Sequence, residues 1–189
     1  FEALRPFLNG KGTFVDAGAN IGPFTLRAAV GRPDLTVAAF EPHPLLRGLL
    51  ENNVRLHGLD NVRVFAAGLG RERGRLVLHQ SSVNSGGHSF IGASPIGDRK
   101  PLGEVEVLAL DGLSGTELPC PVLALKVDVE GFEYQVFEGA ERILRRDHPA
   151  VVFEHSPWAY REQGLDPVQV PAFLTDRGFS ELVAAAGMT

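Results

Sequence analysis

Short apolar runs alternate with helical patterns along most of the chain. Runs of strand length fall at 13–15, 35–40, 62–66, 75–79, 104–108, 122–127, 150–153 and 179–184, and helical patterns fall at 23–30, 44–56, 131–146 and 167–177. The run 122–127 is apolar except for Lys126, which is typical of a strand buried on both faces. Strands and helices that alternate in this way predict an α/β fold with a doubly wound, mostly parallel sheet. The pattern shows no linker, so we expect one domain over residues 1–189.

Two stretches depart from this regular pattern. The helical pattern over 131–146 contains Gly139, where we expect a break. Residues 80–103 have no period and are rich in Ser, Gly and Pro, and compact domains seldom leave so long a stretch unstructured unless it has a function. We therefore predict a substrate loop over residues 81–103, with Asn84, His88 and Ser89 as hydrogen-bonding groups for an acceptor. A disordered stretch without a role is the alternative.

Composition and charge narrow the class of protein. Of the 189 residues, 44% are hydrophobic and 22% are charged, which is typical of a globular rather than a disordered chain. The net charge of −5 argues against a basic surface for phosphates, so we expect no nucleic-acid partner. No apolar run approaches the ~20 residues of a membrane span, and the single cysteine, Cys120, cannot form an intrachain disulfide. These features predict a cytoplasmic globular protein that does not bind membranes.

A glycine-rich turn follows the first predicted strand. It reads Asp16-Ala-Gly18-Ala-Asn20-Ile-Gly22, and Glu41 ends the second predicted strand 19 residues after Gly22. In a doubly wound sheet the ligand lies at the carboxyl ends of the strands, beside the first strand. The glycines allow a tight turn, the next helix directs free N–H groups toward the ligand, and Glu41 can accept two hydrogen bonds from a ribose diol. The pattern therefore predicts a nucleotide-type site made by Asp16, Gly18, Asn20, Gly22 and Glu41.

The spacing of the glycines separates two classes of ligand. A dinucleotide turn has the pattern G-x-G-x-x-G, whereas this chain has Asn20 and Pro23 at the second and third glycine positions. The acidic Asp16 would repel a pyrophosphate but suits a ligand with an ammonium group. S-adenosylmethionine has a ribose and an amino-acid tail and no phosphate, so it is the ligand that this turn favours. A turn that binds nothing and a dinucleotide site are the alternatives.

Candidate catalytic residues follow two later strands. Asp128 ends the run 122–127, Glu130 lies two residues further on, and His155 follows the run 150–153. Parallel strands bring such ends to one edge of the sheet, where Asp128 would lie near the methyl or amino group of the donor. Histidine exchanges protons near neutral pH, so we predict His155 as the general base, with Glu130 orienting it or holding the acceptor. Capping and packing roles are alternatives, as is a Mg²⁺ site, although the spacing matches no recognised metal motif and we predict no metal.

Several motifs resemble, in order, those of the FkbM-type methyltransferases. They are Phe14-Val-Asp-Ala-Gly-Ala-Asn-Ile-Gly22, Phe40-Glu-Pro-His-Pro44, Asn61-Val62 leading to Gly70, Ala109-Leu-Asp-Gly-Leu113, Leu125-Lys-Val-Asp-Val-Glu-Gly131 with Glu133, and Phe153-Glu-His155. The first motif is common to many methyltransferases, and the block that ends at Gly131 makes the match specific. The resemblance covers residues 12–180. It implies a class I methyltransferase fold with strand order 3-2-1-4-5-7-6, S-adenosylmethionine as methyl donor, and O-methylation of sugars or natural products.

Two features depart from the pattern of this family. Ala66 ends the third predicted strand, where relatives often have a polar residue, so we expect no side chain at that position to recognise adenine. The chain also stops soon after its sixth strand, where a full class I sheet needs one more. Part of the last strand pair is therefore absent unless residues 74–108 supply a strand.

The sequence thus predicts an S-adenosylmethionine-dependent O-methyltransferase that acts on a hydroxyl of a small-molecule natural product, sugar or other glycan. The alternative is a non-catalytic domain that keeps the fold and binds an adenosine-type ligand or a protein partner. The complete set Asp16, Gly18 and Glu41, together with Asp128 and Glu130, favours the enzyme. A degenerate domain would be expected to lose some of these residues.

Overall fold

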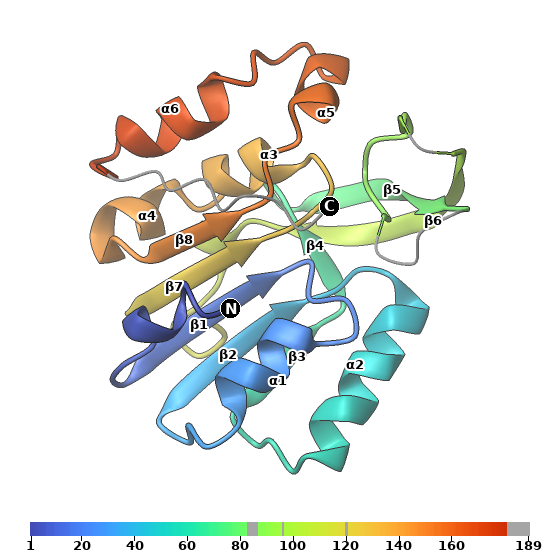
Figure 1. Cartoon of the computed structure of the whole chain (residues 1–189). Helices are drawn as coiled ribbons and strands as arrows, with labels where there is room; N and C mark the ends of the chain where they lie inside the picture. The colour runs from blue at the N-terminus through green and yellow to red at the C-terminus, as the bar shows by residue number, and fades with distance from the viewer. Residues whose placement is uncertain (83–86, 96, 120, 181–189) are drawn as a thin grey trace.

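The central sheet has five parallel strands in the order β3-β2-β1-β7-β8 (Figure 1). The computed structural model describes residues 1–189 except 83–86, 96, 120 and 181–189. The strands are β1 (Gly12–Ala17), β2 (Leu35–Phe40), β3 (Val62–Phe65), β7 (Val122–Val127) and β8 (Ala150–Phe153). Their order follows the first five positions of the class I methyltransferase sheet. The predicted fold class is therefore confirmed.

Helices cover both faces of this sheet (Figure 1). On β1, Phe14 packs in the cluster that includes the α1 residues Ala28 and Ala29, whereas Val15 packs in the cluster that includes Phe137 of α3. Because both faces are buried, the strands are apolar almost throughout. One face is covered by α1 (Pro23–Ala29) and α2 (Pro44–Leu56), and the other by α3 (Glu133–Glu138), α4 (Glu141–Asp147), α5 (Pro157–Glu162) and α6 (Gln169–Thr175). Two short 3₁₀ helices, η1 (Arg5–Phe7) and η2 (Leu110–Gly112), complete the helical elements of the described chain.

A second, three-stranded sheet lies beside the carboxyl edge of the central sheet (Figure 1). In it β4 (Ala67–Leu69) pairs in parallel with β6 (Arg99–Leu108), and β5 (Gly74–Ser81) pairs antiparallel with β6. Because β5 and β6 are longer than the strands that the pattern predicts, the segment between them shrinks to 82–98. The expectation that residues 74–108 could supply a strand to the central sheet is wrong, since β6 pairs with β4 and β5 pairs with β6 in the second sheet.

The helical elements follow the sequence pattern with a few differences. The predicted helix over 131–146 is two helices, and the chain bends at Gly139, where an added Cβ would collide with the carbonyl of Gly70. The pattern gave no prediction of α5. Phe179 and Ser180 have no strand structure, and the rest of the predicted strand 179–184 lies outside the described residues. In the part of the chain that the structure describes, each helix is too short or too polar to cross a membrane.

Candidate functional site

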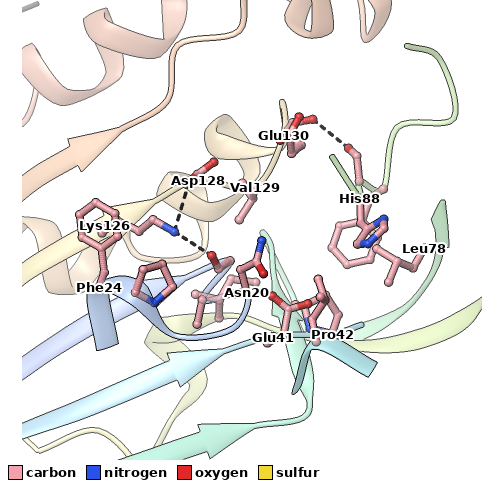
Figure 2. A pocket seen from close by; sticks show the side chains of 18 residues that line it. Asn20, Phe24, Glu41, Pro42, Leu78, His88, Lys126, Asp128, Val129 and Glu130 are labelled. Atoms are coloured by element: carbon pink, nitrogen blue, oxygen red, sulfur yellow. Dashed lines mark hydrogen bonds and ion pairs between the residues drawn. The ribbon is translucent and has the colours of Figure 1, made fainter. Parts of the chain in front are cut away.

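A pocket of about 180 Å³ lies at the carboxyl edge of the central sheet, beside the ends of β1 and β7 (Figure 2). The strand order reverses at β1, and ligands of doubly wound folds bind at such a point. The predicted site residues that line the pocket are Gly18, Asn20, Glu41, His88, Ser89, Asp128 and Glu130. Among the described residues, Asp16, Gly22 and His155 do not line it, and Asn84 lies outside the described residues.

The glycine turn lies so close to the segment that follows β7 that its first glycine, Gly18, cannot carry a side chain. Gly18 has a φ of +72°, and an added Cβ would collide with the carbonyl oxygen of Asp128. Gly22, which precedes α1, has a φ of +97°, and an added Cβ would lie 2.6 Å from Cδ1 of Leu50. Asn20 adopts a left-handed φ of +54°, which asparagine tolerates better than most residues. At Gly18 the pocket is therefore lined by backbone atoms without a side chain.

Glu41 is held rigidly at the end of β2. Its Oε1 accepts a hydrogen bond from the backbone N–H of His43, and its Oε2 accepts one from that of Asn20, both at 2.8 Å. The residue is only 5% exposed, and burial raises the pKa of Glu41 although the two N–H donors act in the opposite direction. Each carboxylate oxygen has a further lone pair that can accept a hydrogen bond from a ligand hydroxyl. This carboxylate can therefore hold two adjacent hydroxyl groups.

Asp16, which the sequence places among the ligand-binding residues, lies beneath the glycine turn and does not line the pocket. It is fully buried, with Oδ2 accepting a hydrogen bond of 2.6 Å from the hydroxyl of Thr25 and Oδ1 lying 3.3 Å from Nζ of Lys126. The register of β1 and β7 explains this position, because Asp16 and Lys126 are direct partners across the two strands. The carboxylate of Asp16 therefore supports the turn from behind.

Lys126 is the residue that sequence reasoning missed, and its signal was a single charge in an apolar strand. Its Nζ donates hydrogen bonds to the carbonyls of Ala17 and Gly18, at 3.2 and 2.7 Å, and lies 3.4 Å from Oδ2 of Asp128 (Figure 2). Burial alone would lower the pKa of Lys126, but the charges of Asp16 and Asp128 outweigh it and raise the pKa. This buried cation therefore links the glycine turn to the end of β7.

Three carboxylates lie close together where the chain leaves β7 and β8. One oxygen from each of Asp128, Glu130 and Glu154 lies within 4.8 Å of the other two. Burial, followed by the charges of Glu130 and Asp128, raises the pKa of Glu154 to about 8, and burial also raises that of Glu130. Glu154 is not among the residues that the sequence predicts for the site, and the structure places it in this cluster. Oxygen ligands of this kind could hold a divalent cation.

His155 lies next to this cluster but outside the pocket wall. It is exposed, and its ring centroid lies 5.3 Å from that of Tyr160 and 6.2 Å from that of Phe153. The side chain of Asp128, by comparison, is 48% exposed and lines the pocket. The assignment of His155 as general base stays a prediction.

Residues 87–93, which we call the strap, form the wall of the pocket opposite the glycine turn. His88 stacks on His43 with ring centroids 4.3 Å apart, and its Nδ1 accepts a hydrogen bond from the N–H of Ser81. Burial, with the charges of His43 and Arg99, lowers the pKa of His88 to about 4, so this ring is neutral at neutral pH. The hydroxyl of Ser89 donates to the carbonyl of Glu130 at 2.8 Å. The predicted substrate loop thus shares one pocket with the residues predicted for the cofactor.

The fold and this pocket together define the class of protein. When the five strands of the central sheet are numbered by themselves in chain order, the sheet order is 3-2-1-4-5. Class I methyltransferases have this order, with a glycine turn after the first strand and a carboxylate at the end of the second, as β1 and β2 have here. Residues 16–181 match the family model described as the methyltransferase FkbM domain. The chain belongs to this family, as the motifs indicated.

Two curated relatives have methyltransferase names. "Methyltransferase 1" of Beauveria bassiana is 33% identical over 144 residues, which cover 67% of this chain and 57% of the relative. "Methyltransferase sdnD" of Sordaria araneosa is 30% identical, with 87% of this chain and 72% of the relative covered. The chain therefore spans little more than half the length of the first relative.

A solved structure shows the same fold. The precorrin-6y C5,15-methyltransferase of Geobacter metallireducens matches with a TM-score of 0.55 and 14% identity, over 94% of this chain and 68% of that one. At this identity the likeness supports the fold alone.

Proposed function

We propose that this chain transfers a methyl group from S-adenosylmethionine to a hydroxyl group of a small-molecule natural product or a sugar. The observation that carries the proposal is the pairing of Glu41 with the turn at Gly18 in one pocket. A buried carboxylate with free lone pairs suits a ribose diol, and bare backbone at Gly18 leaves room for the rest of the ligand. The family and the names of the relatives support the same class of reaction.

The pocket residues fit a donor with a positively charged tail. Asp128 offers a partly exposed carboxylate beside Lys126, and Glu130 offers a second carboxylate nearby. The donor supplies an electrophilic methyl group on a cationic sulfur, so the main task of the protein is to align the acceptor with it, which can contribute about 7–11 kcal/mol. Glu41 and the turn would hold the donor, while His88 would face the acceptor.

The acceptor hydroxyl must lose its proton as the methyl group is transferred. We assign the acceptance of this proton to His155. Glu154, which precedes it in the chain and belongs to the carboxylate cluster, is the competing residue. A positioned base contributes about 10²- to 10⁴-fold in rate. His155→Ala should therefore keep the affinity for S-adenosylhomocysteine within a few-fold and lose at least ~10²-fold in turnover. If Glu154→Gln shows that loss and His155→Ala does not, the assignment to His155 is wrong.

The decisive experiment measures donor binding and transfer separately. S-adenosylhomocysteine at 100 times its dissociation constant should stabilise the folded protein by about 2.7 kcal/mol, which a thermal shift detects. A panel of hydroxylated metabolites and sugars with methyl-labelled donor then tests transfer. Binding without transfer to any acceptor would favour the non-catalytic alternative, and no binding would overturn the proposed function.

A further inference from the structure

The strap forms one wall of the pocket without belonging to either hydrophobic face of the central sheet. His88, Ser89 and Phe90 line the pocket, and Ser89 exchanges two backbone hydrogen bonds with His79 of β5, at 2.8 and 3.0 Å. The ring of Phe90 packs edge-on against Phe132 with centroids 5.2 Å apart. Besides these contacts, one side chain from outside the strap donates hydrogen bonds to three of its carbonyls.

That side chain is Arg99, the first residue of β6. Its guanidinium donates hydrogen bonds to the carbonyls of Gly87, Ile91 and Ala93, at 2.9 to 3.1 Å. The side chain of Arg99 is only 3% exposed, so its guanidinium is largely shielded from solvent. A planar guanidinium has five N–H donors in fixed directions and can span three carbonyls, whereas a lysine ammonium acts as a single point.

Arg99 also reaches the other side of the pocket. Its Nη2 lies 3.4 Å from Oε2 of Glu130, and its guanidinium lies over the ring of Trp158 at 5.7 Å from the ring centroid. Ser89 adds a second connection, since its hydroxyl donates to the carbonyl of Glu130, as the dashed line at Glu130 in Figure 2 shows. The strap is therefore joined to the turn after β7, which carries two of the pocket carboxylates.

The size of the pocket gives this connection a function. Sites for small molecules usually enclose about 300–1,000 Å³, whereas the pocket measures about 180 Å³ with the strap in this position. A donor of nucleoside size needs more room than this, and movement of the strap away from the glycine turn would provide it. The bonds that hold the strap then set how readily the pocket opens.

We propose that Arg99 is a positioning residue that fastens the strap over the donor and slows the release of the demethylated product. The inference rests on the proposed function, because it takes the pocket to be the donor site. It concerns a residue to which neither the motifs nor the family match gives a role. Arg99 acts through the strap and through Glu130, not by reacting with the substrates.

The test compares Arg99→Lys with Lys100→Met. Lys100 is exposed and adjacent on the same strand, so its variant removes one positive charge and leaves the strap in place. Trp158 is the single tryptophan of the chain and lies against Arg99, so its fluorescence can follow the release of S-adenosylhomocysteine in stopped-flow experiments. We expect Arg99→Lys to release S-adenosylhomocysteine at least ~10-fold faster than the unchanged protein, and Lys100→Met to match the unchanged protein.

A role in stability alone would lower the melting temperature of Arg99→Lys and leave the release rate unchanged at temperatures well below melting. That result would overturn the proposal. If Arg99→Lys does not fold, Ser89→Ala removes the second connection, and a faster release in this variant supports the proposal while an unchanged rate contradicts it.

Amide hydrogen exchange without any ligand separates this inference from the proposed function. The amides of Ser89 and Ile91 are hydrogen-bonded within the strap and to its neighbours, so they should exchange faster in Arg99→Lys if Arg99 fastens the strap. If these amides exchange at the same rate in Arg99→Lys as in the unchanged protein, Arg99 does not hold the strap in place. If the unchanged protein does not bind S-adenosylhomocysteine at all, the proposed function fails by itself, whatever the exchange shows.

Discussion

The two walls of the pocket are held in place in different ways. The turn wall, residues 18–20 with Glu41, is fastened by backbone groups: the N–H groups of Gly18 and Ala19 donate to the carbonyl of Phe40, and that of Asn20 donates to Glu41. The strap is fastened mainly by the side chains of Arg99 and Ser89. A wall built from backbone needs particular residue types at fixed spacing, so a short motif encodes it. A wall held by a distant arginine has no such local motif.

The largest effect is expected where the turn wall touches β7. Gly18→Ala puts a Cβ into the carbonyl of Asp128, so we expect affinity for S-adenosylhomocysteine to fall by more than ~100-fold, measured by calorimetric titration. Gly31→Ala is the matched control, because Gly31 has nearly the same φ, +70°, and no atom of the described residues lies within 4 Å of the added Cβ. It should cost about 1–2 kcal/mol of stability and leave the affinity unchanged. Equal affinities in the two variants would show that the close approach at Gly18 does not shape the pocket.

Lys126→Met should have the next largest effect, since it leaves Asp16 buried without its ion-pair partner. Removal of one partner from a buried pair costs about 3–5 kcal/mol. Urea unfolding measures this loss, and the double variant Lys126→Met with Asp16→Asn should recover part of it. A single variant as stable as the unchanged protein would mean that the cation is not needed to hold the turn wall.

Glu41→Ala tests the ribose-binding assignment within the turn wall. Hydrogen bonds to charged groups contribute about 1.5–3 kcal/mol, and water replaces part of this, so we expect the donor affinity to fall by roughly 10- to 100-fold. Glu51→Ala on α2 is the control, because this exposed carboxylate lies outside the pocket. Unchanged affinity in calorimetry with Glu41→Ala would remove Glu41 from the ribose-binding role.

The smallest effect is expected on the pH dependence of stability, and it concerns Glu133 beside the turn that follows β7. The fully buried Glu133 accepts hydrogen bonds from the N–H groups of Val129 and Gly131, and burial raises its pKa to about 7. The folded state thus binds a proton that the unfolded state has lost between about pH 4.5 and pH 7, so this group makes stability fall as the pH rises through that range. Glu133→Gln should flatten the dependence in denaturation measured from pH 5 to pH 8. The exposed Glu162→Gln should not, and an equally steep profile in Glu133→Gln would contradict the assignment.

Most of the central fold could be predicted because its information is local. Alternating apolar runs and helical stripes gave the strands of the central sheet and five of its helices, with errors of a few residues at the ends. What the pattern missed depends on pairing: β6 extends back to Arg99 because β5 offers it a partner as far as Ser81. The helix α5 is six residues long, too short to show a helical period.

The sequence predicted the pocket-lining residues that lie in the glycine turn, at strand ends or in the loop without period. Gly18, Asn20 and Glu41 follow from the turn and from the edge of the sheet. The position of Asp16 could not be predicted, because it depends on Lys126 standing opposite it in the register of β1 and β7. Arg99 could not be predicted either, since its three carbonyl partners lie six to twelve residues before it in a segment without period.

The order of strands in the central sheet has a consequence for how the protein folds. Lys126 reaches a carbonyl of the glycine turn that lies 108 positions earlier in the chain. Contacts of such long sequence separation form slowly, because a large loop must close before they stabilise anything. Until β7 arrives, one edge of β1 is open and can pair with the wrong strand, which is how aggregation begins in folding intermediates. An amino-terminal fragment that ends before β7 contains the whole glycine motif and Glu41, and we expect it to bind no donor.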